Sequence, residues 1–427
     1  MKKSAKNKKI RHYKDPLREY HPATSVILVG YRSGLSQNSV KAPLFRTSTF
    51  EFSSAKDGEK FFQRAYHLPG NDKKEPGLIY SRLNNPNIEI AEDKLVAAEE
   101  GAHHALLFPS GMSAISLTVL SLLPQNAKIL YTDPVYGGSY LFFKEFCPKR
   151  FGIQTFPVDT SDLKKVEALL QKEGPFDLVY LETPANPTMM LTDIKAIRAL
   201  MKKHSPKALM AVDNTFMGPV FQSPLKIGAD IVLYSATKFI GGHSDIIAGV
   251  CLTKEKELID KIRDFRTILG ATTAPDTAWL LARSIETLWV RMERQAEKAA
   301  KVAIQLSQHP KIEKVFYPGL LTPKDSQQYK IFQSQCKGPG SMVAFNLKKN
   351  NRLASFRLLD SLDICHLAVS LGGTETLIEH PRSMTHSDMS KHDLDRAKIG
   401  EGMIRLSVGL ESSEDIVKDI FEGLKNV

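Results

Sequence analysis

The segment YSATKFIGGHSDIIAG at residues 234–249 holds one lysine, Lys238, between an apolar run and a glycine pair. A lysine that is partly removed from water at a strand end has a lowered pKa, so its neutral amine can bind an aldehyde and later transfer protons. Taken alone, the segment fits a surface lysine better, because lysines are rarely buried. His243, in the same segment, is expected to be structural. The chemical interpretation of Lys238 therefore depends on the groups that lie near it.

An aldehyde cofactor with a pyridine ring needs an acid at the ring nitrogen and a flat side chain against the ring. Asp213 ends the apolar run of AVDNT, where a carboxylate is costly unless it meets a cation. Its alternative role is to cap the following turn. Tyr136 precedes two glycines in DPVYGGSY, which allow the backbone to approach a ligand. Its ring can stack on a cofactor and its hydroxyl can act as acid or base, although a single tyrosine more often serves packing.

A cofactor phosphate needs a cup of backbone N–H groups and hydroxyls. The segment PSGMSA places Gly111 and Met112 at the expected start of a helix, where free N–H groups attract an anion. The hydroxyls of Ser235 and Thr237 are positioned in the sequence to complete this cup. The alternative is an ordinary turn between a strand and a helix.

Three further residues are typical of anion binding. Tyr80 and Arg82 in IYSRLNNPN suit a phosphate, although they lie in the N-terminal arm. Arg405 lies inside the apolar strand MIRLSVGLE, and its burial requires an anion such as an amino-acid carboxylate. The structural alternative for Arg405 is an ion pair with Glu411 or Asp415.

The middle of the chain alternates short apolar runs with helical patterns, which predicts an α/β domain with a mostly parallel sheet. Ligands of such sheets bind at the carboxyl ends of the strands. The polar clusters PSGM, DPVYGG, ETPANP, DNT and SATK all fall at those ends. From Pro275 a helical pattern predicts one long connecting helix over 275–310 that leads to a smaller α+β domain. Its expected apolar face is formed by Leu281, Ile285, Leu288, Met292, Ala296, Ala299 and Ala303.

Three regions follow from these patterns. Residues 1–80 are expected to form an irregular N-terminal arm, with a basic, disordered tail at 1–20 and a turn-rich loop at 68–77. Residues 81–293 are predicted to be the large α/β domain, and residues 294–427 the smaller C-terminal α+β domain.

Composition excludes several classes of protein. The net charge of +11 comes from 58 basic and 47 acidic residues, and much of the excess lies in the tail. No aromatic-basic motif accompanies it, so a solvated tail is expected rather than binding to nucleic acid or a membrane. The four cysteines lack metal-ligand or disulfide spacing, which favours reduced thiols in a cytoplasmic protein without a metal. The apolar segment 105–124 is predicted to be a strand entering a buried helix rather than a membrane span.

Together and in this order, the clusters resemble the cysteine/methionine-metabolism family of pyridoxal phosphate (PLP) enzymes. That family includes cystathionine γ-synthase, cystathionine β- and γ-lyases and methionine γ-lyase. The resemblance runs from KAPLFRTSTFEF to IRLSVGLE, over residues 40–427, and includes YSRLNNPN, SGMSAI, YGGSY, ETPANPT, AVDNTF and YSATKFIGGHSD. It implies pyridoxal 5′-phosphate as the cofactor. It also implies the aspartate-aminotransferase type of fold (PLP fold type I), with a mostly parallel seven-stranded sheet and a smaller C-terminal domain.

The resemblance also implies a role for each candidate residue. Lys238 would carry the cofactor as a Schiff base and act in catalysis with Tyr136, which also stacks on the ring, while Asp213 would hold the pyridine nitrogen. A homodimer, paired into a homotetramer, would bring Tyr80 and Arg82 of one subunit to the phosphate of another. The other implied contacts are Gly111, Met112, Ser235 and Thr237 to the phosphate, Asn186 to the phenolic oxygen, and Ser370 and Arg405 to the amino-acid end of the substrate.

The segment LAVSLGGTETLIEHPRSMTH at 367–386 most resembles methionine γ-lyase. Val369 stands where cystathionine-specific γ-enzymes tend to have a glutamate, and valine suits an apolar thioether tail. The chain departs from methionine γ-lyases at Gly138, usually a cysteine, and at Arg266-Thr267, usually Lys-Asp. Cystathionine γ-synthase, with a homoserine-ester substrate, and cystathionine β- or γ-lyase are therefore alternatives. A transaminase on the same fold and a non-catalytic binding protein are alternatives from other classes.

Overall fold

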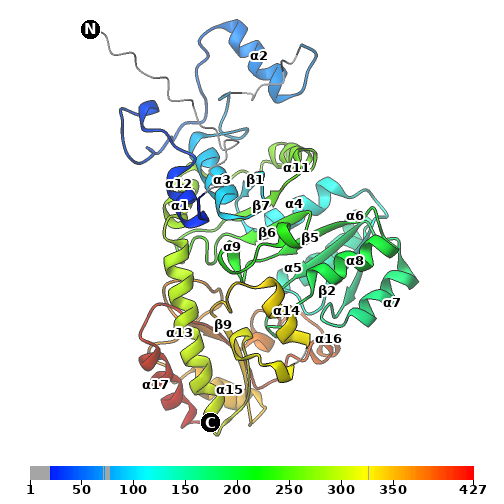
Figure 1. Cartoon of the computed structure of the whole chain (residues 1–427), viewed down its shortest axis with the longest axis vertical. Coiled ribbons are helices and arrows are strands. Elements are labelled where there is room, and N and C mark those ends of the chain that lie inside the picture. Colours follow the sequence, from blue (N-terminus) through cyan, green and yellow to red (C-terminus); the bar gives the residue numbers. More distant parts are fainter. Residues whose placement is uncertain (1–19, 71, 73–76, 326) are drawn as a thin grey trace.

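The computed structural model describes residues 20–70, 72, 77–325 and 327–427. The predicted basic tail, apart from Tyr20, and residues 71 and 73–76 of the predicted loop 68–77 lie outside this range. Two sheets organise the described chain, and one long helix passes from the first to the second (Figure 1).

The first sheet has seven strands in the order β1-β7-β6-β5-β4-β2-β3. Only β7 runs antiparallel to its neighbours, so the prediction of a mostly parallel sheet is confirmed. The central strands are buried on both faces, which explains their continuous apolar sequences. The strands are β1 (His104–Phe108), β2 (Lys128–Thr132), β3 (Gln154–Val158), β4 (Leu178–Glu182), β5 (Leu209–Asp213), β6 (Ile231–Ser235) and β7 (Gly249–Thr253).

Helices cover both faces of this sheet. One apolar cluster joins it to α3 (Pro86–Ala98), α7 (Leu163–Glu173) and α8 (Ile194–His204). A second cluster, on other strand residues, joins it to α4 (Gly111–Leu122) and α11 (Lys256–Leu269). The remaining segments are α5 (Gly137–Leu141), a π-helical stretch at Phe142–Phe146, α6 (Cys147–Phe151), α9 (Gly218–Phe221) and α10 (Pro224–Ile227).

The second sheet has five strands in the order β10-β11-β12-β9-β8. Its core contains the C-terminal half of α13 together with α15 and α17, at the lower end of Figure 1. The expected serine cap of the last helix is present, because the Ser412 side chain accepts a hydrogen bond from the Asp415 N–H. The elements are β8 (Ile312–Phe316), α14 (Gln327–Gln335), β9 (Met342–Leu347), α15 (Arg352–Leu359), β10 (His366–Leu367), β11 (Leu377–Glu379), α16 (Lys391–Arg396), β12 (Met403–Ser407) and α17 (Ser413–Leu424).

The single connecting helix predicted over 275–310 is wrong, because the chain forms two helices, α12 (Pro275–Ile285) and α13 (Leu288–Gln308). The Ser284 carbonyl, which would continue the first helix, accepts hydrogen bonds from the Thr287 N–H, the Thr287 hydroxyl and the Arg291 guanidinium. The predicted apolar face is nevertheless buried throughout. The proposed domain boundary between residues 293 and 294 falls inside α13.

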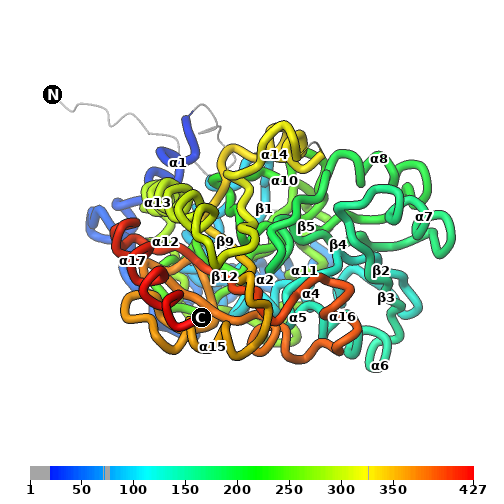
Figure 2. The backbone as a smooth tube through the Cα atoms, turned by 90° about the horizontal axis from the view of Figure 1, so that it is seen from below, coloured from blue at the N-terminus to red at the C-terminus, as the bar shows by residue number. Residues whose placement is uncertain are grey.

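The N-terminal arm is more regular than the sequence suggested. It contains α1 (Pro22–Leu28) and α2 (Ala55–Ala65), which begins at a Ser54 cap that accepts from the Asp57 N–H. Figure 1 shows α2 projecting away from the body of the molecule. By contrast, α1 packs against α3 through Val26, and it lies at one edge of the body in Figure 2. The segment 105–124 forms β1 and α4, as predicted, and no helix within the described residues is long and apolar enough to cross a membrane.

Candidate functional site

Lys238 lies just beyond the carboxyl end of β6, where loops of the two sheets meet. Its Nζ donates a hydrogen bond to the Ser370 hydroxyl at 2.6 Å. Burial and, to a smaller extent, the charge of Arg405 lower the pKa of Lys238 to about 8. Lys238 is thus neither a surface residue nor fully charged near neutral pH, which removes the main objection to its chemical interpretation.

Two residues of α13 hold the loops on which Lys238 and Ser370 lie. The Arg291 guanidinium donates to the carbonyls of Phe239 (2.8 Å) and Ile240 (3.3 Å), directly after Lys238. One helical turn later, the Gln295 side chain donates to the Gly373 carbonyl at 2.6 Å, three residues after Ser370. Residues four apart share one helix face. A single face of α13 therefore sets the position of both loops.

Asp213 ends β5 and is buried. Its Oδ1 accepts from the N–H (3.0 Å) and hydroxyl (2.6 Å) of Thr215, so the turn-capping alternative describes one of its oxygens. Its Oδ2 accepts from the Tyr180 hydroxyl at 3.2 Å. Burial raises the pKa of Asp213, because a charged carboxylate is costly where water is excluded.

Glu182 ends β4 directly opposite Asp213 in the parallel register, and the sequence analysis missed it. Its two oxygens accept from the backbone N–H groups of Tyr136 (3.1 Å) and Asn186 (2.9 Å). Burial, and then the charge of Asp213, raise the pKa of Glu182. The signal that singled out Asp213, an acid at the end of an apolar strand, applies equally to Glu182 in LVYLE.

The expected phosphate cup is partly assembled. Gly111 is the first residue of α4, and a Cβ at this position would lie 2.9 Å from the Ser235 Cβ, so glycine permits the close approach of α4 to β6. Met112 follows in the same first turn. The Thr237 hydroxyl is already used, because it donates to the Ala248 carbonyl at 3.2 Å and accepts from the Ala248 N–H at 3.0 Å.

Arg405 is buried on β12, and the alternative pairing with Glu411 or Asp415 is wrong. Its partner is Glu379, which faces it across the β11–β12 ladder at 2.8 Å between Nη1 and Oε1. Glu411 instead accepts from the N–H and hydroxyl of Thr376. Sequence reasoning missed Glu379 because antiparallel pairing of two distant strands creates this contact.

Arg405 also reaches the residues predicted to surround the substrate. Its Nη1 donates to Asn186 Oδ1 at 3.2 Å and its Nη2 to the Ser370 carbonyl at 3.0 Å. Ser370 has a φ of +91°, a backbone conformation that is strained for a residue with a side chain. Val369, beside it, is 55% exposed and forms no part of the apolar core.

Two of the predicted phosphate ligands, Arg82 and Tyr80, make their contacts outside the Lys238 cluster. The Arg82 Nη1 donates to the Thr267 carbonyl at the end of α11. Tyr80 pairs with Thr49 through a backbone bridge, and its side chain is half-exposed. Among the described residues, neither of them forms a hydrogen bond or ion pair with Lys238.

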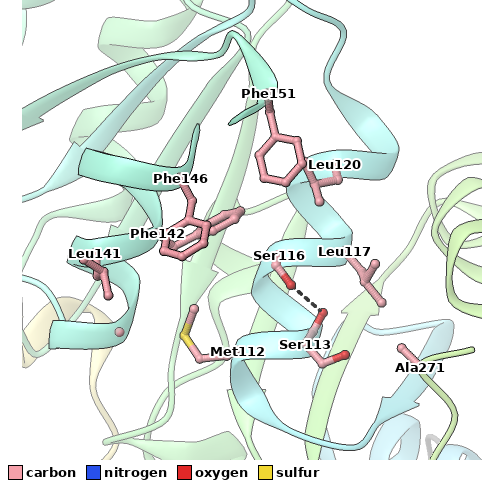
Figure 3. A pocket seen from close by; sticks show the side chains of 11 residues that line it. Met112, Ser113, Ser116, Leu117, Leu120, Leu141, Phe142, Phe146, Phe151 and Ala271 are labelled. Atoms are coloured by element: carbon pink, nitrogen blue, oxygen red, sulfur yellow. Dashed lines mark hydrogen bonds between the residues drawn. The ribbon is translucent and has the colours of Figure 1, made fainter. Parts of the chain in front are cut away.

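An apolar groove of about 520 Å³ lies beside the phosphate cup. Figure 3 shows aromatic side chains of segment 142–151 on one side and side chains of α4 on the other. Lys238 is not among its lining residues, so the groove adjoins the candidate site at Met112 without reaching the lysine. The lining includes Met112, Leu117, Gly138, Phe142, Phe146 and Phe151.

These residues fit pyridoxal phosphate. The lysine has a lowered pKa, the helix start offers N–H groups to a phosphate, and Asp213 is a buried carboxylate suited to a protonated ring nitrogen. No group of three or more metal-ligating side chains occurs in the described ranges, and the four cysteines are free. The donor set therefore matches an organic cofactor with a phosphate.

Comparison with known proteins gives one consistent result. The model of the family described as "Cys/Met metabolism PLP-dependent enzyme" matches residues 23–425. L-methionine gamma-lyase of Fusobacterium nucleatum subsp. polymorphum is 41% identical over 96% of this chain and 99% of its own. Human cystathionine gamma-lyase is 40% identical over 82% of this chain and 84% of its own.

The fold agrees with a solved structure as well. Cystathionine gamma-lyase from Lactobacillus plantarum, complexed with L-serine, superposes with a TM-score of 0.84 at 34% identity, over 96% of this chain and 99% of that one. The prediction of PLP fold type I is confirmed, and so is the dependence on pyridoxal phosphate.

Proposed function

The chain belongs to the cysteine/methionine-metabolism family of PLP-dependent enzymes, and from this premise we propose that it is a carbon–sulfur lyase of the methionine γ-lyase kind. Its substrate would be L-methionine or a related thioether amino acid, and its products 2-oxobutanoate, a thiol and ammonia. The observation that supports this proposal best is the chain of contacts from Lys238 through Ser370 to Arg405. Through it, the amine that would accept the proton and the cation that would bind the carboxylate both contact the same serine.

Bound pyridoxal phosphate supplies an electron sink for the charge that develops at the substrate Cα. Lys238 would hold the cofactor and then take the α-proton at Nζ, for which a pKa of about 8 is well suited. Asp213 would hold the ring nitrogen in its protonated form. Glu182 keeps the backbone of Tyr136 in place, so that the Tyr136 ring can stack and its hydroxyl can protonate the leaving sulfur.

The remaining contacts would orient the two ends of the ligand. The N–H groups of Gly111 and Met112 and the Ser235 hydroxyl would bind the phosphate. Thr237 would join them if its hydroxyl turned from Ala248. Asn186, fixed by Arg405 and Glu182, would meet the phenolic oxygen.

The position of Val369 supports the proposal that the substrate has an apolar tail. It is exposed next to Ser370, where a glutamate would suit the distal amino group of cystathionine. The alternative functions are cystathionine γ-synthase and cystathionine β- or γ-lyase. The named relatives include a cystathionine gamma-lyase, and elimination and replacement share the first proton transfers.

A second copy of this chain would complete the site. Tyr80 and Arg82 suit a phosphate but form no hydrogen bond or ion pair with Lys238 in the described part of their own chain. We propose that they reach the site of a partner in a homodimer, and that dimers pair into a tetramer. The partner would also cover the apolar groove, because Met112 belongs to both the groove and the phosphate cup.

Product analysis tests the function directly. Purified protein with pyridoxal phosphate is incubated separately with methionine, cystathionine, cysteine, or a homoserine ester plus a thiol. Release of 2-oxobutanoate and methanethiol from methionine supports the proposal. Pyruvate and homocysteine from cystathionine alone would favour a β-lyase, and thioether synthesis from the ester a γ-synthase. Lys238→Ala is the control, and undiminished turnover by it would exclude the whole mechanism.

A further inference from the structure

We propose that Glu379 is a counter-ion that tunes carboxylate affinity in the substrate site: it neutralises Arg405 before substrate binds and so weakens the binding of the substrate carboxylate. The inference rests on the proposed role of Arg405 in holding that carboxylate.

The contact is a buried ion pair. Arg405 Nη1 and Glu379 Oε1 are 2.8 Å apart, and the two side chains are 3% and 1% exposed. Opposite charges at this distance attract strongly where water is excluded. An incoming carboxylate must therefore share Arg405 with a negative charge that is already present.

The hydrogen bonds of the Glu379 carboxylate indicate a role beyond stability. Glu379 Oε1 accepts hydrogen bonds from the Arg405 guanidinium and from the Thr385 hydroxyl, the latter at 2.8 Å. Glu379 Oε2 is buried and has no hydrogen-bond partner among the described residues. A purely structural buried carboxylate is expected to have both oxygens satisfied.

Glu379 also affects the titration of Lys238. Its charge raises the pKa of Lys238, against the larger lowering by burial and by Arg405. Burial raises the pKa of Glu379 itself, and Arg405, the Thr385 hydroxyl and Lys238 oppose this rise. Its bonds to Glu379, Asn186 and Ser370 within the described chain engage at most three of the five N–H groups of Arg405. The guanidinium therefore has donors left for a second carboxylate, and Glu379 limits how favourable that contact is.

Glu379→Gln tests this relationship, because glutamine keeps an oxygen acceptor for Thr385 and Arg405 but removes the charge. The holoenzyme is titrated with glycine, which has no bond to cleave, and with methylamine, which is glycine without its carboxylate. Absorbance of the bound cofactor gives each Kd. We expect the Kd of glycine to fall about tenfold, equivalent to about 1.4 kcal/mol, while that of methylamine is unchanged. The thermal midpoint should rise more with glycine than in the native protein.

Two further variants control the result. Glu411→Gln removes a partly buried carboxylate of the same sheet region that pairs with Thr376 and not with Arg405, so its glycine Kd should match the native value. Glu379→Asp keeps the charge and should leave the glycine Kd within about threefold. A glycine Kd that is unchanged in folded Glu379→Gln, or a tenfold fall in Glu379→Asp, would overturn the proposal.

These measurements are separate from the test of the proposed function. Failure to cleave any sulfur amino acid would leave the glycine titration interpretable. If instead Arg405 does not bind carboxylates, substituting it would leave the glycine Kd unchanged.

Discussion

The hydroxyl oxygen of Ser370 lies 2.6 Å from the Lys238 Nζ, although the two residues belong to loops of different sheets. The Ser370 carbonyl also accepts from Arg405, and its backbone has a φ of +91°. The residue thus joins the amine to the guanidinium while holding a strained conformation, which is typical of a functional position rather than a stabilising one.

Two substitutions of Ser370 separate its hydrogen bond to Lys238 from its strained backbone conformation. Ser370→Ala removes the acceptor of Lys238, and we expect kcat/KM to fall about tenfold to a hundredfold, as for the loss of a hydrogen bond to a charged group. Ser370→Gly should lower kcat/KM by the same factor. Its thermal midpoint should nevertheless be higher than that of Ser370→Ala, because glycine tolerates a positive φ. Steady-state kinetics and thermal unfolding measure both. Equal midpoints for the two variants would show that the backbone is not strained.

Cofactor capture should follow the titration of Lys238. Its pKa is lowered to about 8 from 10.5, so the neutral amine is present at a pH where an exposed lysine is charged. The rate at which the protein without cofactor binds pyridoxal phosphate should rise about tenfold per pH unit below 8 and level off above it. Absorbance growth over pH 6–10 measures this rate. A rate that keeps rising to pH 10 would mean that the amine is not desolvated.

Arg291 should matter without contacting substrate. Arg291→Met keeps the apolar stem but removes the donor to the buried carbonyls of Phe239 and Ile240, whereas the Ser284 carbonyl keeps its bonds from Thr287. We expect the free energy of unfolding to fall by about 3 kcal/mol and kcat to fall with it. Arg294→Met, which removes an exposed pair with Glu297 from the same helix, is the matched control and should change little.

Mixing two inactive variants tests the shared site. Lys238→Ala and Arg82→Ala should each be inactive alone, because each spoils every site of a homodimer. After unfolding and refolding together, half of the dimers are mixed and carry one intact site, so about a quarter of native activity should return. No recovery, in mixtures shown to exchange subunits, would place Arg82 in the site of its own chain, and an active Arg82→Ala protein would place it outside any site.

Val369→Glu should change substrate preference. A glutamate beside Ser370 can bind a distal amino group through a charge-assisted hydrogen bond. We expect the ratio of kcat/KM for cystathionine to that for methionine to rise about tenfold or more. Val369→Gln, which is similar in size but uncharged, is the control. An equal change in both variants would mean that side-chain size, and not charge, decides the preference.

The sequence predicted the strands and the polar groups at their ends because both leave local patterns. This is how the sequence pointed to Asp213 at the end of β5 and to the helix start at Gly111, beside Ser235. Glu379 and Arg291 were missed because their partners are brought near by strand pairing and helix packing between distant segments. The break between α12 and α13 was missed for a similar reason, since the Ser284 carbonyl is drawn away by a side chain seven residues later.

The path of α13 has a consequence for how the molecule unfolds. Its N-terminal half packs into the core of the first sheet and its C-terminal half into that of the second, and between them Arg291 and Gln295 hold the two loops of the site (Figure 1). One inserted residue between positions 291 and 295 would rotate these side chains apart by about 100°. The two sheets should therefore melt as one cooperative unit. Exchange of either sheet for that of a relative should preserve activity only if the helix is kept in register.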